Sequence, residues 1–175
     1  MIAPQNNIKM SITCMAASFV VNRIVKTTEE ACRLHRIYKI SIGDLKYIGQ
    51  TNRMPEERFK EHVRHTSKCT LLKEALQTNN ATLDTLAIVG PHDVNVVERV
   101  AIALENTVSP DGFNISTGGP GVTRRDEKYE KFRKDVLLVR NLMKKGLVSY
   151  DILHMRGDIS LTNAEFDAVK RLCNK

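Results

Sequence analysis

The sequence predicts an α+β fold: a small three-stranded antiparallel sheet flanked by helices, followed by a helical C-terminal region. Three observations predict this class. Residues 36–50 contain two apolar, aromatic and β-branched runs around a Ser-Ile-Gly-Asp turn segment, which is typical of a β-hairpin. Residues 82–89 form a third β-rich, apolar run. Between and after these runs, apolar residues recur at helical spacing.

The helices that connect the strands follow from start signals and apolar spacing. Pro55 at a first helical position, followed by two glutamates in the first turn, predicts a helix over residues 55–65. A second helix is expected over residues 69–77, which ends before two asparagines. After the third strand, a Pro-His-Asp turn offers Asp93 as the N-cap of a helix over residues 94–106.

The tail of the chain is predicted to be helical. Apolar residues at 3-4-3-4 spacing predict an amphipathic helix that stops at Gly146. A short helix over residues 150–156, capped by Ser149, and a capping-box helix over residues 162–172 follow. These two helices and their turn resemble a helix-turn-helix. A plain helical bundle packed on the preceding module is the alternative.

The composition is that of a folded globular protein and excludes several classes. Of 175 residues, 42% are hydrophobic and 27% are charged, which excludes a disordered or collagen-like chain. No apolar run approaches the roughly 20 residues of a membrane helix. Residues 10–21 lack the longer apolar core and cleavage site of a secretory signal. We therefore expect an intracellular protein of the cytoplasm or nucleoid, with no membrane partner.

The charge is unevenly distributed. Residues 122–175 carry 13 lysines and arginines against 8 acidic residues, which accounts for +5 of the formal net charge of +7. We divide the chain into a lead-in (1–34), an α+β module (35–121) and a basic helical tail (122–175). The basic excess favours a polyanionic partner, nucleic acid first.

The four cysteines favour neither a zinc site nor a disulfide framework. Cys14, Cys32, Cys69 and Cys173 are far apart and include no C-x-x-C pair. No cysteine and histidine spacing matches a zinc finger. We expect free thiols in a reducing compartment.

Six polar residues occur in an order that points to chemistry. Two tyrosines lie on the strands of the hairpin, an arginine and a histidine at i and i+4 lie on the next helix, a glutamate lies on the helix after the third strand, and an asparagine precedes a Gly-Gly pair. These residues are Tyr38, Tyr47, Arg58, His62, Glu98 and Asn114.

The ordered set resembles the GIY-YIG nucleases, and most closely their phage and mobile-element (homing-type) branch. The matching residues cover about residues 35–119: Ile37-Tyr38, Tyr47-Ile48-Gly49-Gln50-Thr51, Arg58-x-x-x-His62, Glu98, Gly112-Phe113-Asn114 and Gly118-Gly119. One departure is visible, because Arg36 occupies the position where the family name expects glycine.

The resemblance implies a divalent-metal-dependent endonuclease that hydrolyses DNA phosphodiesters. Glu98 would bind one Mg²⁺ or Mn²⁺, since hard cations prefer oxygen ligands. Arg58 would hold the scissile phosphate through its planar fork. Tyr38 and Tyr47 would position or deprotonate the attacking water, and His62 would assist proton transfer.

The residues themselves leave several roles open. Glu105 lies seven residues after Glu98 and shares its helical face, so only the family pattern distinguishes the two carboxylates. The sequence does not say which tyrosine is the base. Asn114 would orient the phosphate or support its neighbours, or it is a turn residue that caps local backbone.

Basic residues of the tail are the candidates for binding the DNA backbone. Four of them follow the Gly-Pro-Gly loop and two lie on the last predicted helix: Arg124, Arg125, Lys128, Lys131, Lys170 and Arg171. A solvated charged face is the alternative, because Asp126, Glu127 and Glu130 are interspersed with them.

Two other functions fit the same residues. One is a non-catalytic DNA-binding regulator built on a degenerate nuclease fold. The other is a structure-specific, repair-type nuclease that acts on branched DNA or structured RNA. The sequence indicates no oligomeric state, and a transient dimer on DNA is one way to cut both strands.

Overall fold

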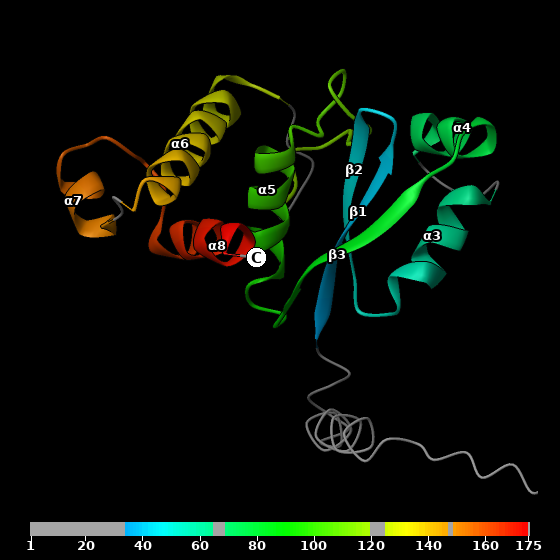
Figure 1. Cartoon of the computed structure of the whole chain (residues 1–175), viewed down its shortest axis with the longest axis horizontal. Helices are drawn as coiled ribbons and strands as arrows, with labels where there is room; N and C mark the ends of the chain where they lie inside the picture. Colours follow the sequence, from blue (N-terminus) through cyan, green and yellow to red (C-terminus); the bar gives the residue numbers. More distant parts are fainter. Residues whose placement is uncertain (1–33, 65–68, 120–124, 147–148, 175) are drawn as a thin grey trace, which may run out of the picture. The chain divides into compact units, whose positions relative to one another are not determined.

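The computed structural model describes residues 34–64, 69–119, 125–146 and 149–174, so predictions for the lead-in lie almost entirely outside it (Figure 1). The predicted class is confirmed, with a three-stranded antiparallel sheet and a helical C-terminal region. In chain order the elements are β1 (His35–Ile42), β2 (Leu45–Thr51), α3 (Pro55–Val63), α4 (Thr70–Thr78), β3 (Thr82–Val89), α5 (Val94–Glu105), α6 (Glu127–Lys144), α7 (Tyr150–Met155) and α8 (Asn163–Cys173). No helix within the described residues is both long and apolar enough to cross a membrane.

The predicted hairpin forms two of the three strands. β1 and β2 pair antiparallel around a two-residue turn, and β3 pairs antiparallel with the other edge of β1, so the strand order is β2-β1-β3. The pairing of β1 with β3 shifts between Ile37 and Tyr38 and leaves Leu86 as an extra residue of β3. A bulge of this kind bends the strand and increases its twist.

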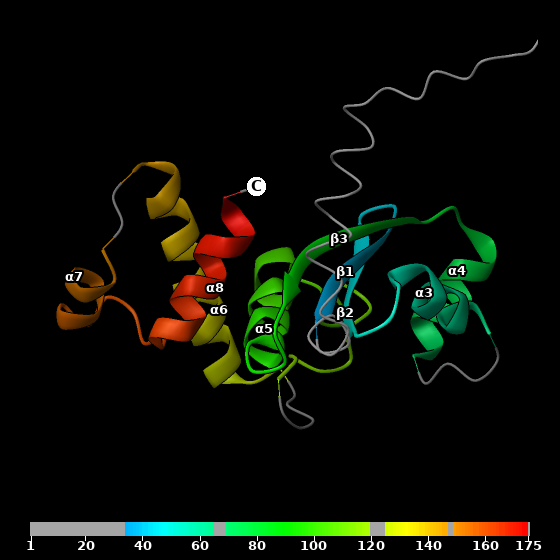
Figure 2. The same cartoon turned by 90° about the horizontal axis from the view of Figure 1, so that it is seen from below.

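Helices cover both faces of the sheet (Figures 1 and 2). On one face, Tyr38 and Ile40 pack with Leu72 of α4, and α3 lies beside them. On the other face, Ile37 and Ile48 join a larger core with α5, and α6 and α8 pack on α5. Successive residues of a strand point to opposite faces, so the hairpin supplies side chains to both layers.

The C-terminal helices share the core of α5. The Arg99 guanidinium of α5 lies 4.2 Å from the centre of the Phe132 ring of α6 and pairs with Glu165 of α8 at 3.4 Å. Phe166 of α8 is buried in the same core. The tail is therefore packed on the preceding module, as in the bundle alternative. Residues on both sides of the boundary predicted at residue 121 share one continuous core.

The helix starts differ in part from those predicted. Thr162 and Glu165 form the predicted capping box of α8. Asp93 and Ser149 precede α5 and α7 as predicted, but neither side chain forms a capping hydrogen bond, which corrects both predictions. The backbone of Asp93 is itself helical, with φ −92° and ψ −16°, whereas a capping residue is usually extended. Its carboxylate pairs instead with Arg171 of α8 at 3.4 Å.

Candidate active site

The two tyrosines lie next to each other on one face of the hairpin. In the register of β1 and β2, Tyr38 pairs with Gly49 and Ile40 pairs with Tyr47. Both tyrosine side chains therefore point to the face that α3 covers, and their ring centres are 6.3 Å apart. Tyr38 is fully buried and Tyr47 is partly buried.

Gly49 makes room for the Tyr38 ring. A Cβ atom at this position would lie 2.5 Å from Tyr38 Oη, 2.6 Å from Tyr38 Cζ and 2.9 Å from Tyr47 Cε1. No side chain larger than hydrogen fits there without moving a tyrosine. The glycine of the Tyr-Ile-Gly motif thus has a steric function, because it lets the Tyr38 hydroxyl cross over β2.

His62 of α3 contacts both tyrosine rings. Its Nε2 atom lies 2.9 Å from Tyr38 Oη, and its ring meets the Tyr47 ring edge-on, with 4.9 Å between centres. Burial, and then the positive charge of Arg58, lowers the pKa of His62 to about 4. The imidazole is therefore neutral at neutral pH and can accept a proton.

Arg58 reaches the same hydroxyl from the preceding turn of α3. Its positive charge lowers the pKa of Tyr38, and it donates from Nη1 to Glu61 Oε2 at 2.5 Å. Glu61 also pairs with Arg53 at 2.6 Å. The hydrogen bond with Glu61 is the main reason that the pKa of Arg58 is raised. The sequence did not single out Glu61 or Arg53, which read as ordinary exposed charges.

The Tyr38 hydroxyl therefore has one hydrogen-bond partner, His62, and two further polar neighbours, Arg58 and Tyr47, which lower its pKa. Burial raises the pKa of Tyr38 to about 12, although Arg58 acts in the opposite direction. The pKa of Tyr47 is also raised, first by burial and then by Tyr38. Both phenols are protonated at neutral pH.

Glu98 is positioned by α5 and by the edge strand β2. Its Oε2 atom accepts a hydrogen bond from Gln50 Nε2 at 3.1 Å, and the carboxylate accepts another from the backbone N–H of Gly119. Burial raises the pKa of Glu98, and these hydrogen bonds oppose that rise. Its negative charge raises the pKa of both tyrosines. Gln50, part of the recognised motif but given no role from the sequence, is thus a contact of this carboxylate.

The structure distinguishes Glu98 from Glu105. Lys46 and Gln50 lie four residues apart on the same face of β2, and each contacts one of these carboxylates. Lys46 Nζ lies 2.6 Å from Glu105 Oε2 and neutralises it. Glu98 pairs with no cationic side chain among the described residues. This contrast favours Glu98 as the carboxylate available to a metal ion.

Asn114 attaches the loop after α5 to the edge of β2. Its Oδ1 atom accepts from the N–H of Ile48 and its Nδ2 donates to the carbonyl of Ile48, both at 2.8 Å. The neighbouring Phe113 N–H donates to the carbonyl of Lys46. Because the Asn114 amide is buried and paired with the backbone of β2, it supports the strand that carries Tyr47 and does not face a phosphate.

Glu98 fits a hard divalent cation. No group of three or more His, Cys, Asp or Glu within the described residues could hold a metal, so a cation at Glu98 would have fewer than three such ligands from this part of the chain. Mg²⁺ is often bound in this way, with waters and substrate phosphates as the other ligands. Zinc, which takes three or four protein ligands, does not fit.

The basic residues at the start of the tail differ in whether an acidic side chain already pairs with them. Lys128 and Lys131 are exposed on α6 and form no ion pair with another described residue. Arg125 pairs with two carboxylates, Asp111 at 2.7 Å and a glutamate of α6. Arg124 lies outside the described residues.

On α8, both predicted DNA-binding residues also have acidic partners. Lys170 pairs with Asp167 and Arg171 pairs with Asp93, each at 3.4 Å. All four side chains are about half exposed, so these ion pairs are weak and can exchange for a phosphate.

Comparison with family models, with curated proteins and with solved structures found no match to this chain.

Proposed function

We propose that this protein is a divalent-metal-dependent endonuclease that hydrolyses DNA phosphodiester bonds, as its resemblance to the homing-type GIY-YIG nucleases implies. The observation that carries the proposal is the Tyr38 hydroxyl, which lies 2.9 Å from Nε2 of a neutral histidine and close enough to an arginine and a second tyrosine for both to lower its pKa. A carboxylate close enough to act on both phenols completes the set. An intracellular location, where DNA is available, belongs to the same proposal.

Tyr38 would contact the attacking water once a polar neighbour moves aside, because its side chain is fully buried. Its O–H would donate to Nε2 of neutral His62, and Arg58, which can only donate hydrogen bonds, would donate to its oxygen. A proton taken from water by the Tyr38 oxygen would release the phenolic proton to His62. The phenol does not need to be ionised beforehand, which agrees with a pKa of about 12. Tyr47 contacts the imidazole edge-on and helps to orient it.

Arg58 and Glu98 would act on the phosphate from two directions. A phosphate oxygen would take over the contact that Arg58 makes with Glu61, because the paired side chains are 41% and 29% exposed and the exchange costs little. Mg²⁺ or Mn²⁺ bound at Glu98 would stabilise the negative charge that builds on the phosphate oxygens. Gln50 and the Gly119 N–H hold the carboxylate in place.

The decisive experiment compares two glutamates on one helix face. Supercoiled plasmid is incubated with wild type, Glu98→Gln and Glu105→Gln, with and without Mg²⁺, and DNA binding is measured in parallel. We expect Glu98→Gln to lose at least about 100-fold in cleavage rate while still binding DNA, because one group that stabilises transition-state charge is gone. Glu105→Gln removes a charge that Lys46 already neutralises, so its rate should stay within about threefold.

Three results would separate the alternatives. A wild-type protein that binds plasmid but never cuts it with Mg²⁺ present is a regulator on a degenerate fold. Faster cutting of branched DNA or RNA than of plasmid identifies a structure-specific nuclease. Equal cutting by wild type and Glu98→Gln removes the metal-ligand role. End mapping of the products should give the 5′-phosphate and 3′-hydroxyl ends that the family resemblance implies.

A further inference from the structure

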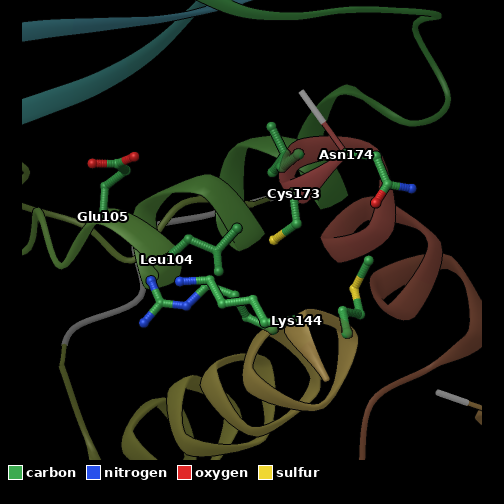
Figure 3. Close-up of a pocket in the computed structure, with 8 residues that line it drawn as sticks. Leu104, Glu105, Lys144, Cys173 and Asn174 are labelled. Carbon is green, nitrogen blue, oxygen red and sulfur yellow. The ribbon is translucent and has the colours of Figure 1, made fainter. Parts of the chain in front are cut away.

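A hollow lies where the C-terminal ends of three helices meet. It has a volume of about 300 Å³ and is lined by the last residues of α5, by α6 near its end and by the end of α8. Leu104, Met143 and Leu172 supply apolar walls. In Figure 3, Lys144 lies across the hollow from Leu104, and the sulfur of Cys173 points into it. We call this feature the C-terminal hollow.

Two cationic side chains line the C-terminal hollow without an acidic partner among the described residues. Arg140 and Lys144 line it, and neither forms an ion pair with another described residue. Arg140 Nε is buried and has no hydrogen-bond partner there. Glu105, the acidic residue of the lining, pairs with Lys46 at 2.6 Å, and its carboxylate points away from the hollow toward the strands (Figure 3).

Both cations act on the interior of the C-terminal hollow. Burial raises the pKa of the Cys173 thiol, and the charges of Arg140 and Lys144 act in the opposite direction. Two like charges beside one apolar wall repel each other. An anion in the hollow would relieve that repulsion.

We propose that the C-terminal hollow binds a phosphate group, and that this group is a backbone phosphate of the DNA held at the proposed nuclease site. A planar guanidinium and an ammonium are the two groups that proteins use most to hold phosphates. Glu105 at the rim and Glu98 lie seven residues apart on one face of α5, a separation of about 10 Å along the helix. That separation corresponds to about three base pairs of duplex. The proposal rests on the proposed function and adds a DNA contact beyond the scissile bond.

The test measures the salt dependence of DNA binding. Full-length wild type, Arg140→Gln, Lys144→Gln and Lys134→Gln are titrated with a labelled duplex in EDTA, so that binding is observed without cleavage. Each variant removes one positive charge, and Lys134 is an exposed residue of α6 outside the hollow lining. We expect the log–log salt slope to fall by about one for Arg140→Gln and Lys144→Gln, with about a five- to tenfold loss of affinity at low salt, and to stay unchanged for Lys134→Gln.

Equal slopes for all four proteins would overturn the proposal, even if plasmid cleavage is normal. A protein that binds DNA with the expected slopes but never cuts it would support the hollow while the nuclease proposal fails. Inorganic phosphate against chloride at equal ionic strength tests the other source of the group. A rise in melting temperature with phosphate that Arg140→Gln abolishes, together with unchanged DNA slopes, would assign the hollow to a free phosphate compound and overturn the DNA contact.

Cys173 offers a second measurement that leaves the sequence unchanged. Its thiol faces the C-terminal hollow, so bound DNA should slow its alkylation, followed by peptide mass spectrometry. An alkylation rate at Cys173 that bound DNA does not change, relative to the same protein without DNA, would count against the proposal.

Discussion

Replacing Gly49 with alanine tests whether the Tyr38 hydroxyl is the centre of the site. The new methyl carbon would stand 2.5 Å from Tyr38 Oη, whereas ordinary contact begins at 3.4 Å. The hydroxyl must therefore move by about 1 Å, and Tyr38 has no exposed surface into which it could relax. A shift of this size stretches the 2.9 Å contact with His62 beyond hydrogen-bonding distance.

The expected cost falls on both activity and stability. A misplacement of about 1 Å at a reacting group costs about 100-fold in rate, and overpacking a filled core costs about 1–3 kcal/mol. For a domain of this size, that destabilisation lowers the melting temperature by about 2–12 °C. The assays are plasmid cleavage under saturating Mg²⁺ and thermal unfolding of the same preparation.

Gly90→Ala is the matched control. No atom lies within 4 Å of a Cβ at Gly90, and its φ is outside the left-handed region, unlike that of Gly43. We expect this control to keep full cleavage and to change the unfolding free energy by less than about 1 kcal/mol. If Gly49→Ala cleaves within threefold of wild type, the Tyr38 hydroxyl does not take part in the chemistry and the reasoning fails.

Three further predictions concern the surroundings of the site. The pKa of His62 is lowered from 6.5 to about 4 in the folded state. The stability that the neutral imidazole contributes is therefore complete above pH 6.5 and is lost as pH falls toward 4. Across this window, the free energy of unfolding of wild type should fall by up to about 3 kcal/mol more than that of His62→Gln, as measured by equilibrium unfolding. Asn114→Ala leaves the N–H and carbonyl of Ile48 without their partners and should lower the free energy of unfolding, measured in denaturant, by about 2–4 kcal/mol. The control Asn80→Ala, at an exposed position, should change it little. Equal stability of the two variants would contradict the supporting role of Asn114. A double-mutant cycle on Lys46 and Glu105 should give a coupling below about 1 kcal/mol, since both side chains are about one-third exposed, and a coupling above 2 kcal/mol would contradict this estimate.

Local signals in the sequence predicted most of the secondary structure. The third strand is at residues 82–89 as predicted, and the helix that starts at Pro55 does so because proline and two glutamates suit a first turn. Side-chain capping was less predictable. Asp93 stands at the expected position, but its carboxylate turns to Arg171 of a helix 78 residues away, and no local pattern contains that partner.

The candidate site could be predicted as an ordered set of residues, but not as an arrangement. The sequence by itself predicted the hairpin with Tyr38 and Tyr47 on its two strands. That the two tyrosines share a face depends on the register around the two-residue turn, which the structure shows. The sequence also limited the carboxylate to one face of one helix, which Glu98 and Glu105 occupy equally.

Only the tertiary structure shows a physical difference between those two glutamates. The difference lies in the residue of β2 that contacts each of them. Lys46 pairs with Glu105, whereas the neutral amide of Gln50 leaves Glu98 without a cationic partner among the described residues. Chain neighbours determine local conformation and the face on which a side chain lies. The charge and pKa of that side chain depend on groups distant in sequence, and these are brought together only when the helix packs on the sheet.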